Sequence, residues 1–220
     1  IASQPPVEPI SLPAELAPED WPGFRGSDRD GRATVATFGT DWDTNAPKEL
    51  WRRSVGLGWS SFTVIGDYIF TQEQRGDGEV VVCYHAETGD EVWTNYIPAR
   101  FDDATGSGPR ATPTYADGKL YVQGATGVIQ CLDASTGAIV WKRHVGDDTG
   151  ARLPTWGFAS SPLIASSKAI VFTGAAGGKS VIAYDLKTGE PAWTAGDGSH
   201  GYGSGQLAEL SGVPQILMIS

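Results

Sequence analysis

Aromatic side chains and one arginine occur in four short segments along the chain. The segments are Gly58-Trp59-Ser60-Ser61, Pro109-Arg110-Ala111-Thr112, Trp156-Gly157-Phe158-Ala159-Ser160 and Gly201-Tyr202-Gly203-Ser204. Aromatic rings and arginine are enriched among the residues that dominate binding energy. We therefore predict a ligand-binding surface formed by Trp59, Ser60, Arg110, Trp156, Phe158 and Tyr202. The alternative is that these side chains pack between structural units.

Patterns that would indicate catalysis or metal binding are weak. Asp102 and Asp103 are neighbouring carboxylates in a predicted loop, where such acids are usually only solvated. The three histidines have no metal-ligand spacing, and no Ser-His-Asp order is visible. The stretch from Gly174 to Ser180 lacks the glycine spacing of a phosphate loop and leads into a strand, so it predicts a hairpin turn. We therefore assign no catalytic residue and no metal ligand.

The elements that position these residues come from an internal repeat. Three copies of one short turn place Thr-Gly shortly before a tryptophan, with a period of about 50 residues, which is typical of propellers and solenoids. The residues of the three copies are Thr88, Gly89 and Trp93; Thr136, Gly137 and Trp141; and Thr188, Gly189 and Trp193. A fourth tryptophan, Trp51, precedes the first copy.

Each copy predicts a β-hairpin whose register is fixed by its turn. Asp133 and Asp185 can accept backbone N–H groups in the turn, and glycine can adopt positive φ at its exit. The tryptophan that follows is expected to pack on a neighbouring unit, burying about 150–250 Å². Cys83 and Cys131 hold equivalent places and are predicted to be buried free thiols, unless adjacent units bring them within disulfide distance.

Four predicted strands per repeat indicate an all-β protein, a β-propeller of four-stranded antiparallel blades. Blades are expected to begin near residues 60, 111, 160 and 204, within a propeller segment spanning 48–220. Residues 1–20 are rich in proline and predict a disordered leader, and residues 21–47 predict an N-terminal loop segment. Residues 48–55 predict a strand that closes the last blade of a ring.

Three and a half blades plus a closing strand make an incomplete ring, because propellers usually have four to eight blades. We therefore expect the remaining blades to come from a longer chain or from a second copy. The composition excludes other classes: a net charge of −10 argues against nucleic-acid binding, and the chain has no apolar run long enough to span a membrane.

The third copy of the turn resembles the tryptophan-docking motif of the pyrroloquinoline-quinone-like β-propeller repeat family. Ala183, Asp185, Thr188, Gly189 and Trp193 match that motif fully, whereas the first two copies have cysteine in place of the alanine. The resemblance covers nearly all of residues 21–220. It is greatest to a branch of secreted bacterial propeller proteins, which implies a periplasmic or extracellular location.

The resemblance implies two activities, because the family contains quinone-dependent alcohol dehydrogenases and non-enzymatic scaffolds. In its enzymes the quinone lies between an aromatic plane and a disulfide of adjacent cysteines, with calcium beside it. This sequence has no Cys-Cys pair. We therefore favour a non-catalytic scaffold that binds a protein or small-molecule ligand, without a cofactor. The alternatives are a dehydrogenase using pyrroloquinoline quinone and calcium, and an inactive accessory domain of a larger exported protein.

Overall fold

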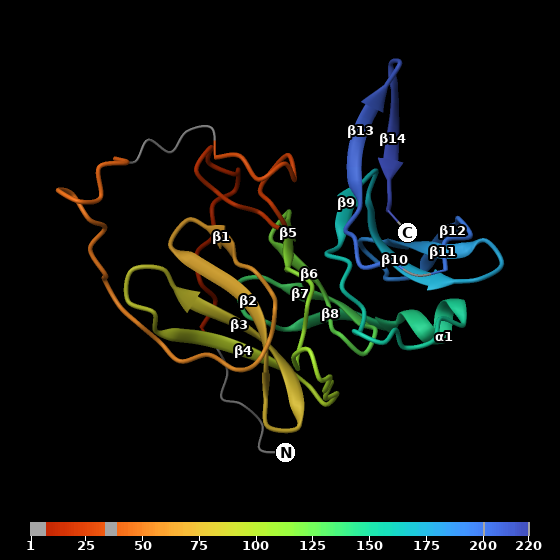
Figure 1. Ribbon diagram of the computed structural model, residues 1–220, viewed down its shortest axis with the longest axis horizontal. Coiled ribbons are helices and arrows are strands. Elements are labelled where there is room, and N and C mark those ends of the chain that lie inside the picture. Colours follow the sequence, from red (N-terminus) through yellow and green to blue (C-terminus); the bar gives the residue numbers. More distant parts are fainter. Residues whose placement is uncertain (1–7, 34–38, 200, 220) are drawn as a thin grey trace.

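Three four-stranded antiparallel sheets follow one another along the chain, and a two-stranded hairpin comes after them (Figure 1). The computed structural model describes residues 8–33, 39–199 and 201–219. The first sheet contains β1 (Thr63–Ile65), β2 (Tyr68–Arg75), β3 (Gly78–His85) and β4 (Glu91–Ile97). The second contains β5 (Thr114–Ala116), β6 (Lys119–Gln123), β7 (Val128–Asp133) and β8 (Ile139–His144). The third contains β9 (Leu163–Ala165), β10 (Lys168–Ala175), β11 (Lys179–Asp185) and β12 (Pro191–Ala195), and the hairpin contains β13 (Gln206–Leu210) and β14 (Val213–Leu217).

Each sheet has its strands in sequence order, which is the arrangement of a propeller blade. The predicted all-β class and the count of three and a half blades are therefore confirmed. In the first blade, β2 and β3 pair along their whole length, from Tyr68 opposite His85 to Arg75 opposite Gly78.

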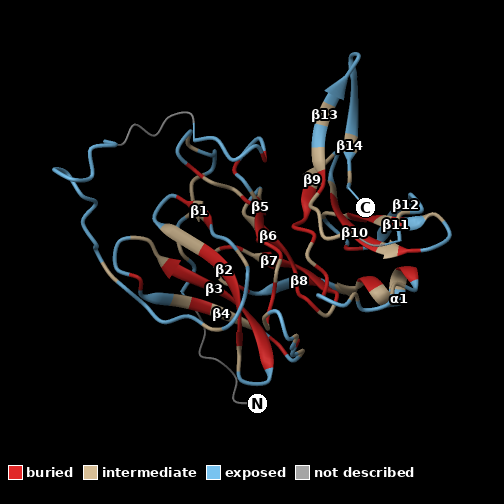
Figure 2. Cartoon of the chain, viewed as in Figure 1, coloured by how far each residue is buried: buried red, intermediate tan, exposed pale blue. Residues whose placement is uncertain are grey.

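The apolar core lies between successive blades (Figure 2). One cluster joins the first two blades and includes Phe70, Trp93 and Leu132. A second joins the second and third blades and includes Tyr121 and Ile182. Cys83 and Cys131 are buried free thiols in these clusters, as predicted, and burial raises the pKa of Cys83 to about 12 and that of Cys131 to about 11.

The tryptophans after the first two Thr-Gly turns, Trp93 and Trp141, contact the turn of the next blade. The indole N–H of Trp93 donates to the carbonyl of Ala134 at 3.2 Å, and that of Trp141 donates to Leu186 at 2.9 Å. The indole of Trp93 lies so close that a methyl group added at Gly137 would come within 2.5 Å of it. Gly137 has φ +72°, so both its conformation and its contact require glycine.

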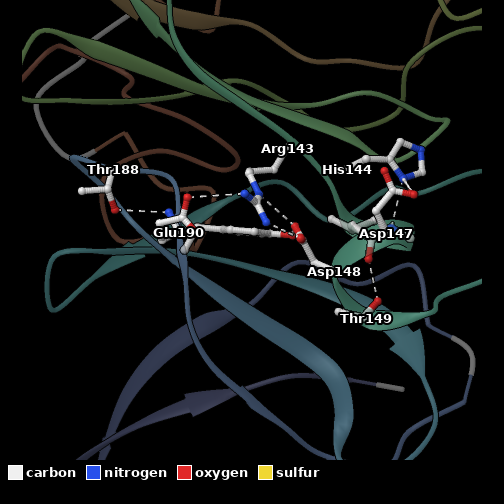
Figure 3. A network of polar contacts seen from close by, with 10 residues as sticks. Arg143, His144, Asp147, Asp148, Thr149, Thr188 and Glu190 are labelled. Carbon is white, nitrogen blue, oxygen red and sulfur yellow. Dashed lines mark hydrogen bonds and ion pairs between the residues drawn. The ribbon is translucent and has the colours of Figure 1, made fainter.

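A short helix, α1 (Val145–Thr149), extends the second blade toward the third. His144 caps it by accepting the Gly146 N–H. Arg143 joins three elements, since it pairs with Asp148 of the helix at 2.5 Å and with Glu190 of the third blade at 3.5 Å (Figure 3). Asp148 also accepts the Tyr184 hydroxyl at 3.0 Å. This polar network fixes the outer edge of the second blade against the third.

The N-terminal region differs from its prediction. Residues 1–7 and 34–38 lie outside the described residues. Residues 8–20 do not behave as the predicted disordered leader: Ile10 packs on the first core cluster and its N–H donates to Ser135 at 3.1 Å. Asp20 accepts the Gly66 N–H at 2.8 Å. Trp21 and Val64 form an isolated antiparallel β-bridge through their main chains. Proline content did not predict these contacts, because it indicates only that the segment is extended. An extended segment can be disordered or can pack along a sheet.

Residues 48–55 form no strand in the described structure, so the predicted closing strand is not seen as such. Trp51 instead lies over Gly89 of the first blade and donates its indole N–H to Ala86 at 2.8 Å. A strand needs a paired neighbour, and the described residues provide none for this segment. Closure of a ring by this segment stays a prediction.

Candidate functional site: the loop face

The four loops that precede the first strands of the blades are joined by a repeated hydrogen bond. The N–H of Ser61 donates to the hydroxyl of Thr112 at 3.2 Å. Thr112 donates in the same way to Ser161, and Ser161 to Ser204, each at 2.9 Å. In each pair, the side-chain hydroxyl in the loop of one blade accepts a main-chain N–H from the loop of the blade before it. This relay gathers the predicted binding loops, and we call the surface that they form the loop face.

We expect Ser161→Ala to lower the free energy of unfolding by about 1 kcal/mol, because a buried N–H at Thr112 would lose its acceptor. The matched control is Ser54→Ala, at an exposed serine, which should change stability by less than about 0.5 kcal/mol. Urea unfolding of both variants measures the difference. Equal stability of the two variants would show that the relay contributes nothing.

Four of the six predicted ligand-binding residues form a connected group. Trp59 is 63% exposed and its indole lies against Gly106. Arg110 donates to the carbonyls of Gly106, Gly108 and Trp156. The ring of Trp156, which is 48% exposed, packs on Tyr202 with ring centroids 5.0 Å apart. The loop face thus presents aromatic surface around a central guanidinium group.

The other two predicted residues face inward. The Ser60 hydroxyl accepts the Gln72 N–H at 3.3 Å, and Ser160 does the same for Phe172 at 3.1 Å in the third blade. Phe158 is buried and lies against Gly127. The sequence cannot distinguish these positions from Trp59 and Trp156, because residue type alone does not tell which side of a loop a side chain takes.

A cleft of about 550 Å³ opens beside Tyr202 on the third blade. The loop of residues 150–155 forms one wall, the end of β10 forms the other, and Phe158 and Phe172 lie at its base. Arg152 lines the cleft and makes no hydrogen bond or ion pair with the described residues. The cleft has the size and the mixed apolar lining of a small-molecule site.

A buried carboxyl group, Glu79, lies behind the loop face between the first two blades. One of its oxygens accepts the Ala125 N–H at 3.0 Å, and the other has no hydrogen-bond partner among the described residues. Burial raises the pKa of Glu79 to about 7, although the Ala125 N–H and the charge of Arg110 oppose that shift. Glu79 therefore changes charge close to neutral pH.

The acidic pair that the sequence singled out is engaged locally. Arg100 binds both oxygens of Asp102, at 2.6 and 2.8 Å, and lowers the pKa of Asp102. Asp103 accepts the N–H of Thr105 at 2.8 Å, and the hydroxyl and N–H of Thr105 lower the pKa of Asp103. Asp103 therefore stabilises the turn at residues 104–105, and Asp102 forms an ion pair with Arg100. No group of three or more His, Cys, Asp or Glu side chains suited to a metal occurs among the described residues.

Sequence reasoning missed the cleft and Glu79. The stretch from Gly174 to Ser180 contains the predicted hairpin turn, between β10 and β11, but nothing in its pattern shows that Gly174 to Ala176 also line a cavity. Glu79 lies in the strand-like run before Cys83, where an acid in place of an apolar residue was its only signal.

The three repeats lie within a segment that matches a known protein family. Residues 40–214 match the family described as outer membrane protein assembly factor BamB. The chain belongs to this family of quinone-type propeller repeats. No helix among the described residues is both long and apolar enough to cross a membrane.

Known relatives of the chain include enzymes. It is 30% identical over 160 residues to the tetrathionate hydrolase of Acidithiobacillus ferrooxidans, a match that covers 67% of this chain and 30% of that protein. It is 36% identical over 86 residues to the lanthanide-dependent methanol dehydrogenase of Methylacidiphilum fumariolicum, covering 37% of this chain and 13% of that one. The chain therefore spans less than a third of these relatives.

The fold is similar to that of solved quinoprotein dehydrogenases. The quinohemoprotein alcohol dehydrogenase ADHIIG from Pseudomonas putida HK5 superimposes with a TM-score of 0.62 and 19% identity, over 84% of this chain and 29% of that one. This likeness shows the β-propeller fold alone.

Proposed function

We propose that this chain is the binding segment of a non-catalytic quinoprotein-like propeller, which recognises a protein or small-molecule ligand through its loop face. The observation that carries the proposal is the connected group of Trp59, Arg110, Trp156 and Tyr202. Two large aromatic side chains in it, Trp59 and Trp156, are 63% and 48% exposed, although a folded chain normally buries much of such surface. Exposed tryptophan and tyrosine side chains gathered at one place are typical of a binding hot spot.

The test is site-specific photo-cross-linking in cells of the organism that makes the protein. A photoreactive phenylalanine analogue replaces Trp156 or Tyr202 on the loop face, and the matched control carries it at Lys187 on the exposed turn of the third blade. We expect one discrete protein adduct, or one bound small molecule found by mass spectrometry, from the loop face and none from the control. Identical adduct patterns at all three positions would refute the proposal.

The alternative activity is that of a quinone-dependent dehydrogenase, and the cleft beside Tyr202 favours it. Its volume suits a ring system, and Arg152 would attract carboxylate groups. The side chains that line the cleft include no carboxylate, however, whereas calcium sites are normally built around carboxylate oxygens. The described residues thus do not fit a calcium-bound quinone, which supports the binding function as the first choice.

Location and assembly are part of the proposal. The matching family is described as an outer membrane protein assembly factor, so we propose a periplasmic or extracellular location in a bacterial envelope. The acidic composition supports a partner other than nucleic acid. Trp193 is 39% exposed where Trp93 is 2% exposed, and β13 and β14 are largely exposed (Figure 2). We propose that further blades, from a longer chain or a second copy, cover this side.

A further inference from the structure

We propose that Arg110 is a positioning residue that holds Trp59 and Trp156 in place together, and that it does not itself contact the ligand. The inference rests on the proposed function, because it describes how the aromatic surface of the loop face is held. It replaces the direct binding role that residue type alone suggests for this arginine.

The guanidinium group of Arg110 is already occupied by main-chain carbonyl groups. It donates to Gly106 at 2.5 Å, to Trp156 at 2.6 Å and also to Gly108. The ring of Phe101 lies 4.5 Å from its central carbon and covers one face. A guanidinium group has five N–H donors in a rigid plane, so three carbonyl partners and one covering ring use most of its binding capacity.

Gly106, whose carbonyl Arg110 binds, also packs against Trp59. Gly106 has φ +146°, and a methyl group added to it would lie 2.5 Å from the indole nitrogen of Trp59. The indole therefore rests directly on main chain whose carbonyl is held by Arg110. The main-chain N–H of Trp59 donates to the carbonyl of Pro109, the residue just before Arg110, at 2.8 Å. Both contacts make the position of Trp59 depend on the loop that Arg110 folds.

The contact with Trp156 crosses to the loop before the third blade. Arg110 holds the carbonyl of Trp156 itself, while the Trp156 ring packs on Tyr202. One side chain thus connects the loops of successive blades. A lysine could keep the charge at this position, but its compact ammonium group cannot reach three carbonyls in one plane. Arg110→Lys therefore separates the geometry of the guanidinium group from its charge.

The test uses fluorine NMR of the protein labelled with 5-fluorotryptophan, without any ligand. Trp59→Phe and Trp156→Phe assign the two resonances, and Trp141 in the core reports folding. We expect Arg110→Lys to shift both assigned resonances and to leave that of Trp141 in place. The control is Arg100→Lys, which alters a neighbouring arginine that binds Gly76 and Asp102, and it should shift neither. Unchanged Trp59 and Trp156 resonances in folded Arg110→Lys protein would overturn the inference.

A second measurement needs no variant and remains decisive if Arg110→Lys fails to fold. In the unaltered protein, the side-chain N–H groups of Arg110 should exchange with water more slowly than those of Arg152, which has no partner among the described residues. Equal exchange rates would show that the guanidinium group is free for a ligand and would overturn the inference. Since neither measurement involves a ligand, failure of the cross-linking experiment would leave their results standing.

Discussion

Replacing Trp141 by alanine is expected to lower the free energy of unfolding by about 3–5 kcal/mol. Trp141 is only 7% exposed and lies between Tyr121 and Tyr184, with ring centroids 6.1 Å from each. Its indole covers Gly189, and its N–H is bonded to Leu186. The substitution would leave a cavity between the second and third blades and an unpaired carbonyl group.

Trp193 is the matched control, because it holds the same place in the next repeat without the same contacts. It is 39% exposed, and its indole N–H has no partner among the described residues. Trp193→Ala should therefore cost about 1 kcal/mol or less. Urea unfolding followed by circular dichroism compares the two variants. A loss below about 1 kcal/mol for Trp141→Ala, or equal losses for both, would contradict a docking role for the repeated tryptophan.

Glu79→Gln is expected to change how stability depends on pH. The pKa of Glu79 is raised to about 7 in the folded protein from 4.5, so the folded state holds a proton that the unfolded state has already lost. That proton stabilises the fold below about pH 4.5, and the stabilisation disappears as the pH rises through about 7. Glutamine keeps an oxygen for the Ala125 N–H but cannot ionise. Relative to the native protein, the variant should therefore gain up to about 3 kcal/mol between pH 5 and pH 8.

Unfolding free energies measured at several pH values test this expectation. The control Glu87→Gln changes an exposed glutamate in the Thr-Gly turn of the same blade and should leave the pH dependence as it is. A constant difference between Glu79→Gln and the native protein from pH 5 to pH 8 would show that the Glu79 carboxyl group does not titrate there.

The repeated turn made the fold predictable, because its residues act locally. Asp133 and Asp185 accept backbone N–H groups in their turns, as predicted, and Gly89, Gly137 and Gly189 all have φ near +70°. A pattern that fixes a hairpin in each repeat also predicts the three four-stranded blades. In the first copy, His85 takes the place of aspartate and still accepts a turn N–H, at 3.3 Å from Glu87.

The N-terminal contacts and the site were less predictable, since they depend on where one segment meets another. Nothing near Ile10 in the sequence indicates that it binds Ser135. Arg110 could be singled out by type, but its three carbonyl partners come from two loops. The cleft likewise combines residues around 150, 174 and 202, which come together only after the second and third blades have packed.

The central claim, a loop face that binds a partner without a quinone, is tested most directly by titrating the protein encoded by the complete gene with pyrroloquinoline quinone and calcium. Tryptophan fluorescence reports binding, since Trp59 and Trp156 lie on the loop face and Tyr202 borders the cleft. A quinone-dependent alcohol dehydrogenase in the same buffer is the positive control. The account predicts no saturable quenching. Saturable quenching with micromolar or tighter affinity would contradict it and establish the dehydrogenase alternative as the leading function.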